Sequence, residues 1–315
     1  MRICCILLFI GCWIGGAYAN SDLVNAIEQV RLSCNDISQD LTEMKKIAGI
    51  STAVTGVGAV SGGVALGTGI AKTGVDKEAD EIEAELKKLQ ELATQQDVFA
   101  LKPINIDWSF VMNDGGGASE IITDKETQLE QLTDKSKKLG NVRTGTLAAS
   151  AVTNIVGAVM SGTNMVKGDL QSKIDGCLMS VKNLSNVRIQ AQLSETATDI
   201  DVMRAEKIIN ACNKWGTVDV ANIDKKASGA TISGGVGAGL GVAGTVTSAI
   251  ANTDSVRSDS SVAGIEKEKK LNTVANVLAG GTTIASVTAT VFNATQISAI
   301  KRAVVIADEC EEALQ

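Results

Sequence analysis

Histidine is absent from this sequence, and proline and aromatic residues are nearly so. With no histidine anywhere, the chain lacks Ser-His and Cys-His nucleophile pairs and the commonest transition-metal ligand. Pro103 is the single proline, and aromatic residues make up 3% of the chain. We therefore expect no enzyme, no cofactor or metal, and no small-molecule substrate.

The sequence also has no run of basic residues. Its formal net charge is -7, whereas a protein that neutralises nucleic-acid phosphates needs concentrated Lys and Arg. We therefore expect no nucleic-acid partner. What the chain has instead is 31 glycines together with abundant Ala, Ser, Thr and Val. Such small side chains let helices pack with their backbones close together.

The N-terminus has the pattern of a secretory signal peptide. Arg2 precedes an apolar run from Ile3 to Ile14, and Ala17-Tyr18-Ala19 forms a small-x-small cleavage pattern. We predict a signal peptide over residues 1–19 and a mature chain that begins near Asn20. An uncleaved anchor helix is the alternative, and the shortness of the apolar run argues against it. The predicted localisation is the periplasm, the cell envelope or the extracellular space.

An internal duplication organises the rest of the sequence. "KKIAGISTAVTGVGAV" from residue 45 resembles "KKASGATISGGVGAGLG" from residue 225, and "KKLGNVRTGTLAAS" from residue 137 resembles "KKLNTVANVLAGG" from residue 269. Four cysteines keep corresponding places in the two halves. If each half is a helical hairpin, Cys34 pairs with Cys177 and Cys212 pairs with Cys310. Bridges between the halves remain the alternative, because the pairing of four cysteines cannot be read from the sequence without the geometry of the fold.

The predicted fold is therefore all-α. Two long antiparallel helical hairpins pack as a four-helix bundle rich in small residues, and a coiled-coil stalk extends the first hairpin. The first hairpin covers residues 20–181, with the coiled-coil extension at about 73–139 and an apolar tip at 97–117. Residues 182–198 form a linker, and residues 199–315 form the second hairpin.

The extension and its tip have distinct patterns. Apolar residues at alternating spacings of four and three, including Val75, Ile82 and Leu86, form a coiled-coil seam. The tip carries large apolar side chains that either fold back on the helix ends or bind a protein partner. These tip residues are Phe99, Ile104, Ile106, Trp108 and Phe110.

Four long segments carry no Asp, Glu, Lys or Arg. They cover residues 47–71, 144–166, 227–253 and 271–300, in a chain that is 21% charged. Their lengths suit a bilayer core, which needs about 20 residues of helix. Small residues one turn apart are typical of membrane-helix packing. The glycines expected to pack between helices are Gly58, Gly62, Gly63, Gly67, Gly237 and Gly241.

The polarity of the last uncharged segment points the other way. Ser286 and Asn293 share one helical face, and Ile284 and Val291 share the opposite face, as in an amphipathic helix with an uncharged, solvated side. Two functions remain open. The first is a non-enzymatic, exported cell-envelope protein whose uncharged helices contact or insert in a membrane, or self-associate. The second is a soluble secreted or periplasmic scaffold that binds a protein through the apolar tip.

Overall fold

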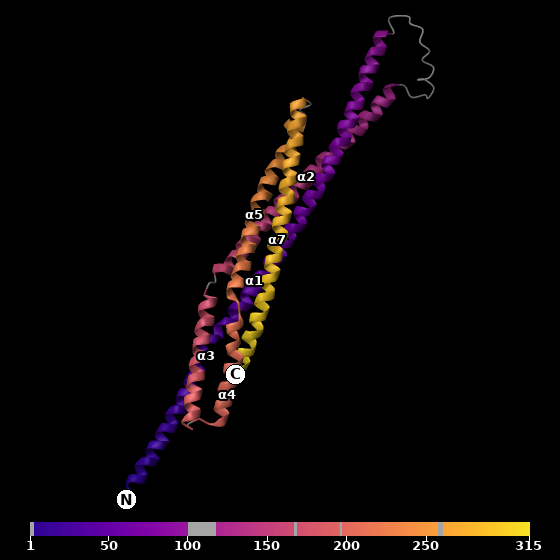
Figure 1. Cartoon of the computed structure of the whole chain (residues 1–315). Helices are drawn as coiled ribbons and strands as arrows, with labels where there is room; N and C mark the ends of the chain where they lie inside the picture. The colour runs from indigo at the N-terminus through magenta and orange to yellow at the C-terminus, as the bar shows by residue number, and fades with distance from the viewer. Residues whose placement is uncertain (1–2, 100–117, 167–168, 196, 258–260) are drawn as a thin grey trace. The chain divides into compact units, whose positions relative to one another are not determined.

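The chain forms an all-α structure, as the sequence predicts. The computed structural model describes residues 3–99, 118–166, 169–195, 197–257 and 261–315 (Figure 1). Seven α-helices and one short 3-10 helix occur in these ranges, which contain no β-strand. The elements are α1 (Ile3–Phe99), α2 (Ala118–Val166), α3 (Leu170–Leu193), α4 (Asp199–Cys212), the 3-10 helix η2 (Asn213–Thr217), α5 (Val220–Ala251), α6 (Asp254–Arg257) and α7 (Val262–Leu314).

The length of the helices follows from the composition. Proline, which interrupts a helix by removing a backbone donor, occurs only at position 103, outside the described residues. The start of α4 is capped by a side chain. The Thr198 hydroxyl accepts a hydrogen bond from the Asp201 backbone amide at the start of α4, where Asp199 and Asp201 also favour the positive end of the helix dipole.

The chain divides into two compact units. Unit 1 comprises Met1–Gly56, Ile155–Gly235 and Val287–Gln315, and unit 2 comprises Val57–Asn154 and Val236–Ser286. Helices α1, α2, α5 and α7 each contribute residues to both units. Each unit thus contains segments from both halves of the predicted duplication.

Outside the uncharged segments, unit 1 has a conventional hydrophobic core. Large aliphatic side chains and one tryptophan are buried there and surround the cysteines. The fully buried members include Leu23, Val30, Ile37, Leu41, Ile174, Leu184, Ile208, Trp215 and Ile223. Lys173 of α3 donates a 2.7 Å hydrogen bond to Asp40 of α1, which raises the pKa of Lys173. This part of the chain is packed as a water-soluble domain would be.

In unit 2, the predicted extension places its seam between α1 and α2. Val75 and Leu86 are buried, and Ile82 is half-buried. Lys125 of α2 donates a 2.8 Å hydrogen bond to Glu85 of α1. The coiled-coil assignment itself stays a prediction. The tip residues Ile104, Ile106, Trp108 and Phe110 lie outside the described residues, as do the side chains of Phe99 and of the predicted signal peptide.

Candidate functional site

The outer surface of the four uncharged segments is apolar. Nineteen Val and Ile side chains in these segments are exposed, and they occur on all four long helices. They are Ile50, Val57, Val60, Val64 and Ile70 on α1; Val152, Ile155, Val156 and Val159 on α2; Ile232, Val236, Val242, Val246 and Ile250 on α5; and Val274, Val277, Ile284, Val287 and Val291 on α7. Scattered exposed aliphatic residues are normal, but so many of them on charge-free helices of both units indicate an interaction surface.

The interior of the same segments is polar. Eleven hydroxyl or amide side chains are buried: Ser51, Thr55, Ser150, Asn154, Ser161, Ser248, Asn272, Thr282, Ser286, Asn293 and Gln296. Small alanines fill most of the remaining buried positions, and among large aliphatic residues only Leu147 and Ile300 are fully buried in the described parts of these segments. The usual arrangement of a soluble bundle, with aliphatic residues inside and polar residues outside, is therefore inverted.

In unit 1, hydrogen bonds join three of the buried polar side chains into a closed ring across three helices. The hydroxyls of Ser51 on α1 and Ser161 on α2 are 2.8 Å apart. Ser161 donates to Asn293 Oδ1 of α7 at 3.0 Å, and Asn293 Nδ2 donates back to Ser51 at 2.9 Å. One turn away, the hydroxyl of Thr290 donates to that of Thr55 at 3.1 Å. Cross-helix bonds of this kind hold helices together where water is excluded.

Unit 2 contains a second polar layer. Asn154 of α2 and Ser286 of α7 exchange two hydrogen bonds: Asn154 Nδ2 donates to the serine oxygen at 2.8 Å, and Ser286 donates to Asn154 Oδ1 at 3.0 Å. Ser150 donates to the Gly58 carbonyl of α1 at 2.7 Å. The polar atoms of this layer are thus satisfied by other helices rather than by solvent.

These hydrogen bonds correct one expectation from the sequence. The face of α7 that carries Ser286 and Asn293 was expected to be solvated, but both side chains are fully buried. The opposite face, with Ile284 and Val291, is the exposed one. The helical period correctly separates the two faces, but it does not determine which of them points inward.

Four of the six expected packing glycines lie close to a neighbouring helix. A methyl group added at Gly241 would lie 2.9 Å from Ala151 Cβ and 3.0 Å from its Cα. Similar approaches, at 2.8–2.9 Å, occur at Gly58, Gly62 and Gly237. Gly63 and Gly67 differ, because a methyl group there would have no neighbouring atom within 4 Å. The backbone of Ala151 leaves no room for a side chain at Gly241, whereas at Gly58, Gly62 and Gly237 the nearest atoms belong to side chains of the neighbouring helices.

In unit 2, a charged network borders the uncharged segments. The buried Lys72 ammonium contacts Asp76 at 2.6 Å and Glu268 at 3.1 Å. The buried guanidinium of Arg143 donates instead to Ser248 at 2.9 Å and to Asn272 at 2.8 Å. Where the charge-free part of unit 2 ends, Lys72 is therefore paired with two carboxylates, whereas Arg143 is held by neutral hydroxyl and amide groups.

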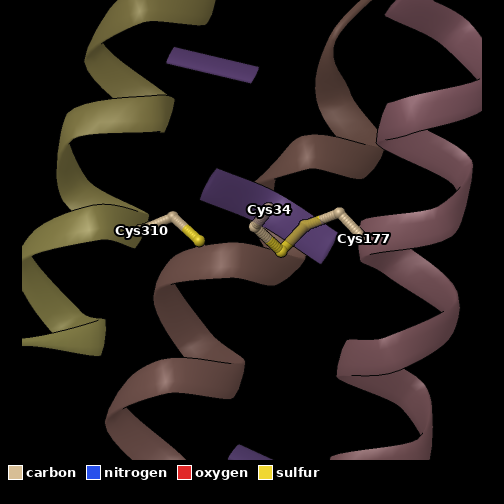
Figure 2. A group of neighbouring side chains, drawn as sticks. All are labelled: Cys34, Cys177 and Cys310. Atoms are coloured by element: carbon tan, nitrogen blue, oxygen red, sulfur yellow. A yellow bond between two sulfur atoms is a disulfide. The ribbon is translucent and has the colours of Figure 1, made fainter. Parts of the chain in front are cut away.

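The four cysteines meet in unit 1. Cys34 of α1 is bonded to Cys177 of α3, and Cys212 of α4 is bonded to Cys310 of α7. This is the pairing that the duplicated halves favour. The Sγ atoms of Cys34, Cys177 and Cys310 lie within 4.8 Å of one another, and Figure 2 shows Cys310 directed toward the Cys34–Cys177 bridge. The two bridges therefore form one compact clasp.

Comparisons with known proteins provide no analogue: no family model, curated protein or solved structure matches this chain. The strongest functional signal is therefore the inverted packing. Within the described ranges, four helices contain stretches long and apolar enough to cross a membrane, by length and composition. The sequence shows the long charge-free segments, but only the structure shows that their polar side chains are buried.

Proposed function

We propose that this chain is a non-enzymatic, exported envelope protein whose four uncharged helices insert into a membrane as a bundle. The observation that carries the proposal is the inversion within the uncharged segments. Val and Ile side chains face outward, whereas hydroxyl and amide side chains are buried, and several of them, such as Ser51 with Ser161 and Asn154 with Ser286, bond to one another across helices. Lipid around the helices accounts for both halves of that pattern.

Water around these helices would be unfavourable. Burying a Val or Ile side chain contributes about 1.5–3 kcal/mol, and nineteen such side chains in the segments remain exposed. In a bilayer the same side chains contact acyl chains. The buried polar groups, such as Asn154 and Ser286, have partners on neighbouring helices, so none of these pairs needs water.

The lengths of the segments also support insertion. The shortest, residues 144–166, has 23 residues and the longest, residues 271–300, has 30. At 1.5 Å per residue these correspond to about 34 and 45 Å of helix. A bilayer core is about 30 Å thick. Each segment is thus long enough to cross, with some tilt.

The positions of the two disulfides also agree with four membrane crossings. Four crossings return the chain to the side on which it started, so Cys34, Cys177, Cys212 and Cys310 share one side of the membrane. Disulfides persist in oxidising compartments, which agrees with a clasp on the exported side of the membrane.

Carbonate extraction tests the proposal. Membranes are isolated from cells that produce the full chain and are washed at alkaline pH, which removes peripheral proteins. We expect the chain to stay in the pellet with integral proteins. Complete release into the supernatant would contradict insertion and would favour the soluble scaffold that binds through the tip.

A further inference from the structure

Six basic residues of unit 1 form a band at one end of the uncharged segments. Lys45 and Lys46 directly precede the charge-free part of α1, Lys225 and Lys226 directly precede that of α5, and Lys301 and Arg302 directly follow that of α7. We call these residues the basic collar. The three pairs are far apart in the sequence, so the sequence shows no basic run.

Contacts within unit 1 place the three pairs at similar heights along the helices. Helices α1 and α7 run antiparallel, because Ser51 bonds to Asn293 and Thr55 to Thr290. Lys45 lies six residues before Ser51 and Lys301 lies eight after Asn293, which is about 9 and 12 Å beyond the same hydrogen bond. On α5, Lys226 Nζ donates to the Thr295 carbonyl of α7 at 3.3 Å. The collar therefore occupies a band about 10 Å deep.

Acidic groups do not neutralise the collar. Among the described residues, no carboxylate oxygen comes within the 4.0 Å ion-pair distance of any of its six side chains. Three lysines that border the uncharged segments in unit 2 behave differently. Lys72 pairs with Asp76 and Glu268, Lys269 with Asp80, and Lys270 with Glu266. These three lysines of unit 2 are paired with carboxylates, whereas the cations of the collar are left for an external anion.

We propose that the basic collar binds the phosphate groups of anionic phospholipids in the leaflet on the disulfide side. This inference rests on the proposed insertion, which puts the charge-free segments in the hydrocarbon and the collar at headgroup depth. The polar layer on each side of a bilayer is about 5–8 Å thick, comparable to the depth of the collar. Long Lys and Arg side chains reach across the remaining distance with their aliphatic stems against apolar surface.

Vesicle partitioning tests this proposal with the full, oxidised chain. The protein is diluted from detergent into vesicles of phosphatidylcholine alone or of phosphatidylcholine mixed with phosphatidylglycerol, and the bound fraction is measured by flotation. We expect tighter partitioning into the anionic vesicles. The double variant K45Q/K46Q should lose about fivefold per charge removed, or roughly 25-fold, on anionic vesicles only.

The matched control is K87Q/K88Q. Lys87 and Lys88 are likewise adjacent lysines of α1; both are exposed, and they lie in the extension. This variant should partition like the wild type on both vesicles. A second collar variant, K301Q/R302Q on α7, should repeat the anionic-specific loss, so that the result does not depend on the folding of one variant. Circular dichroism and intact disulfides establish that each variant is folded.

The outcomes separate the two proposals. Binding to both kinds of vesicle with equal strength, or an equal loss in K87Q/K88Q, would overturn the collar proposal and leave insertion intact. Failure to bind either kind of vesicle would overturn insertion itself, and the collar proposal with it. Anionic preference that both collar variants lose, and that the control keeps, supports the collar as a headgroup site.

Discussion

Replacing Ile284 with lysine distinguishes a lipid-facing surface from a water-facing one. Ile284 is 70% exposed and lies near the middle of the uncharged segment 271–300 of α7. On a water-facing helix, lysine at such a position changes stability by less than about 0.5 kcal/mol. The two environments therefore predict different results for the same substitution.

In a bilayer the substitution strongly opposes insertion of the helix. An isoleucine at the centre of a membrane helix contributes about -0.3 to -0.6 kcal/mol to insertion, whereas a lysine opposes it by about 2.5–3.5 kcal/mol. The difference, about 3–4 kcal/mol, lowers an insertion equilibrium at least 100-fold. We therefore expect I284K to shift a large part of the chain from the carbonate-resistant fraction into the supernatant or into aggregates.

The control for this experiment is M179K. Met179 is 72% exposed on α3, outside the uncharged segments, so lysine there should leave the carbonate-resistant fraction unchanged. If I284K is retained as fully as the wild type and M179K, the outward face of α7 does not contact lipid. The reasoning from inverted packing would then fail.

Three further substitutions test the packing of the helices. Gly241→Ala should destabilise the bundle by about 1–3 kcal/mol, because the added methyl group would press against the α2 backbone, whereas Gly63→Ala should be neutral or slightly stabilising; equal unfolding temperatures in detergent would refute this. Asn154→Leu should lower stability in the same assay by about 0.5–2 kcal/mol through loss of its paired hydrogen bonds to α7, and an unchanged melting temperature would show that the polar layer does not hold the helices together. Non-reducing peptide mapping should recover Cys34 linked to Cys177, and serine at either position should cost about 3–5 kcal/mol, as should serine at both; unequal effects of the two single variants would contradict a simple bridge.

The helices and the cysteine pairing were accessible from the sequence for a physical reason. A chain with one proline and long charge-free segments has few signals that end a helix. The corresponding positions of Cys34 and Cys212, and of Cys177 and Cys310, favoured bridges within each half, and the structure contains those bridges. Local composition and spacing carry both kinds of information.

The burial of the polar side chains could not be predicted from composition and spacing. The pattern of Ser286 and Asn293 opposite Ile284 is the same whether the polar face is solvated or packed inside. What decides the outcome is the presence of Asn154 and Ser161 on α2, each 132 residues away from its partner on α7. Such a pairing depends on the register between helices, which periodicity within one helix does not define.

The basic collar could not be predicted from the sequence for a related reason. Lys45-Lys46 and Lys301-Arg302 are more than 250 residues apart, so neither pair stands out as part of a basic cluster. Antiparallel packing of α1 and α7, fixed by the bond between Ser51 and Asn293, brings them to one level. A cluster of basic residues that forms only on folding can be recognised only when the alignment of the helices along one another is known.

Labelling with a lipid-soluble photoreactive probe tests directly whether the outward face of the uncharged helices contacts lipid. The full chain is reconstituted in vesicles that contain a hydrophobic diazirine, which is activated by light, and labelled residues are located by mass spectrometry. The account predicts label on the outward side chains Val277, Ile284 and Val291 of α7, and none on the inward Ser286 and Asn293. Equal labelling of the two faces, or no label in the uncharged segments while control membrane helices are labelled, would contradict it.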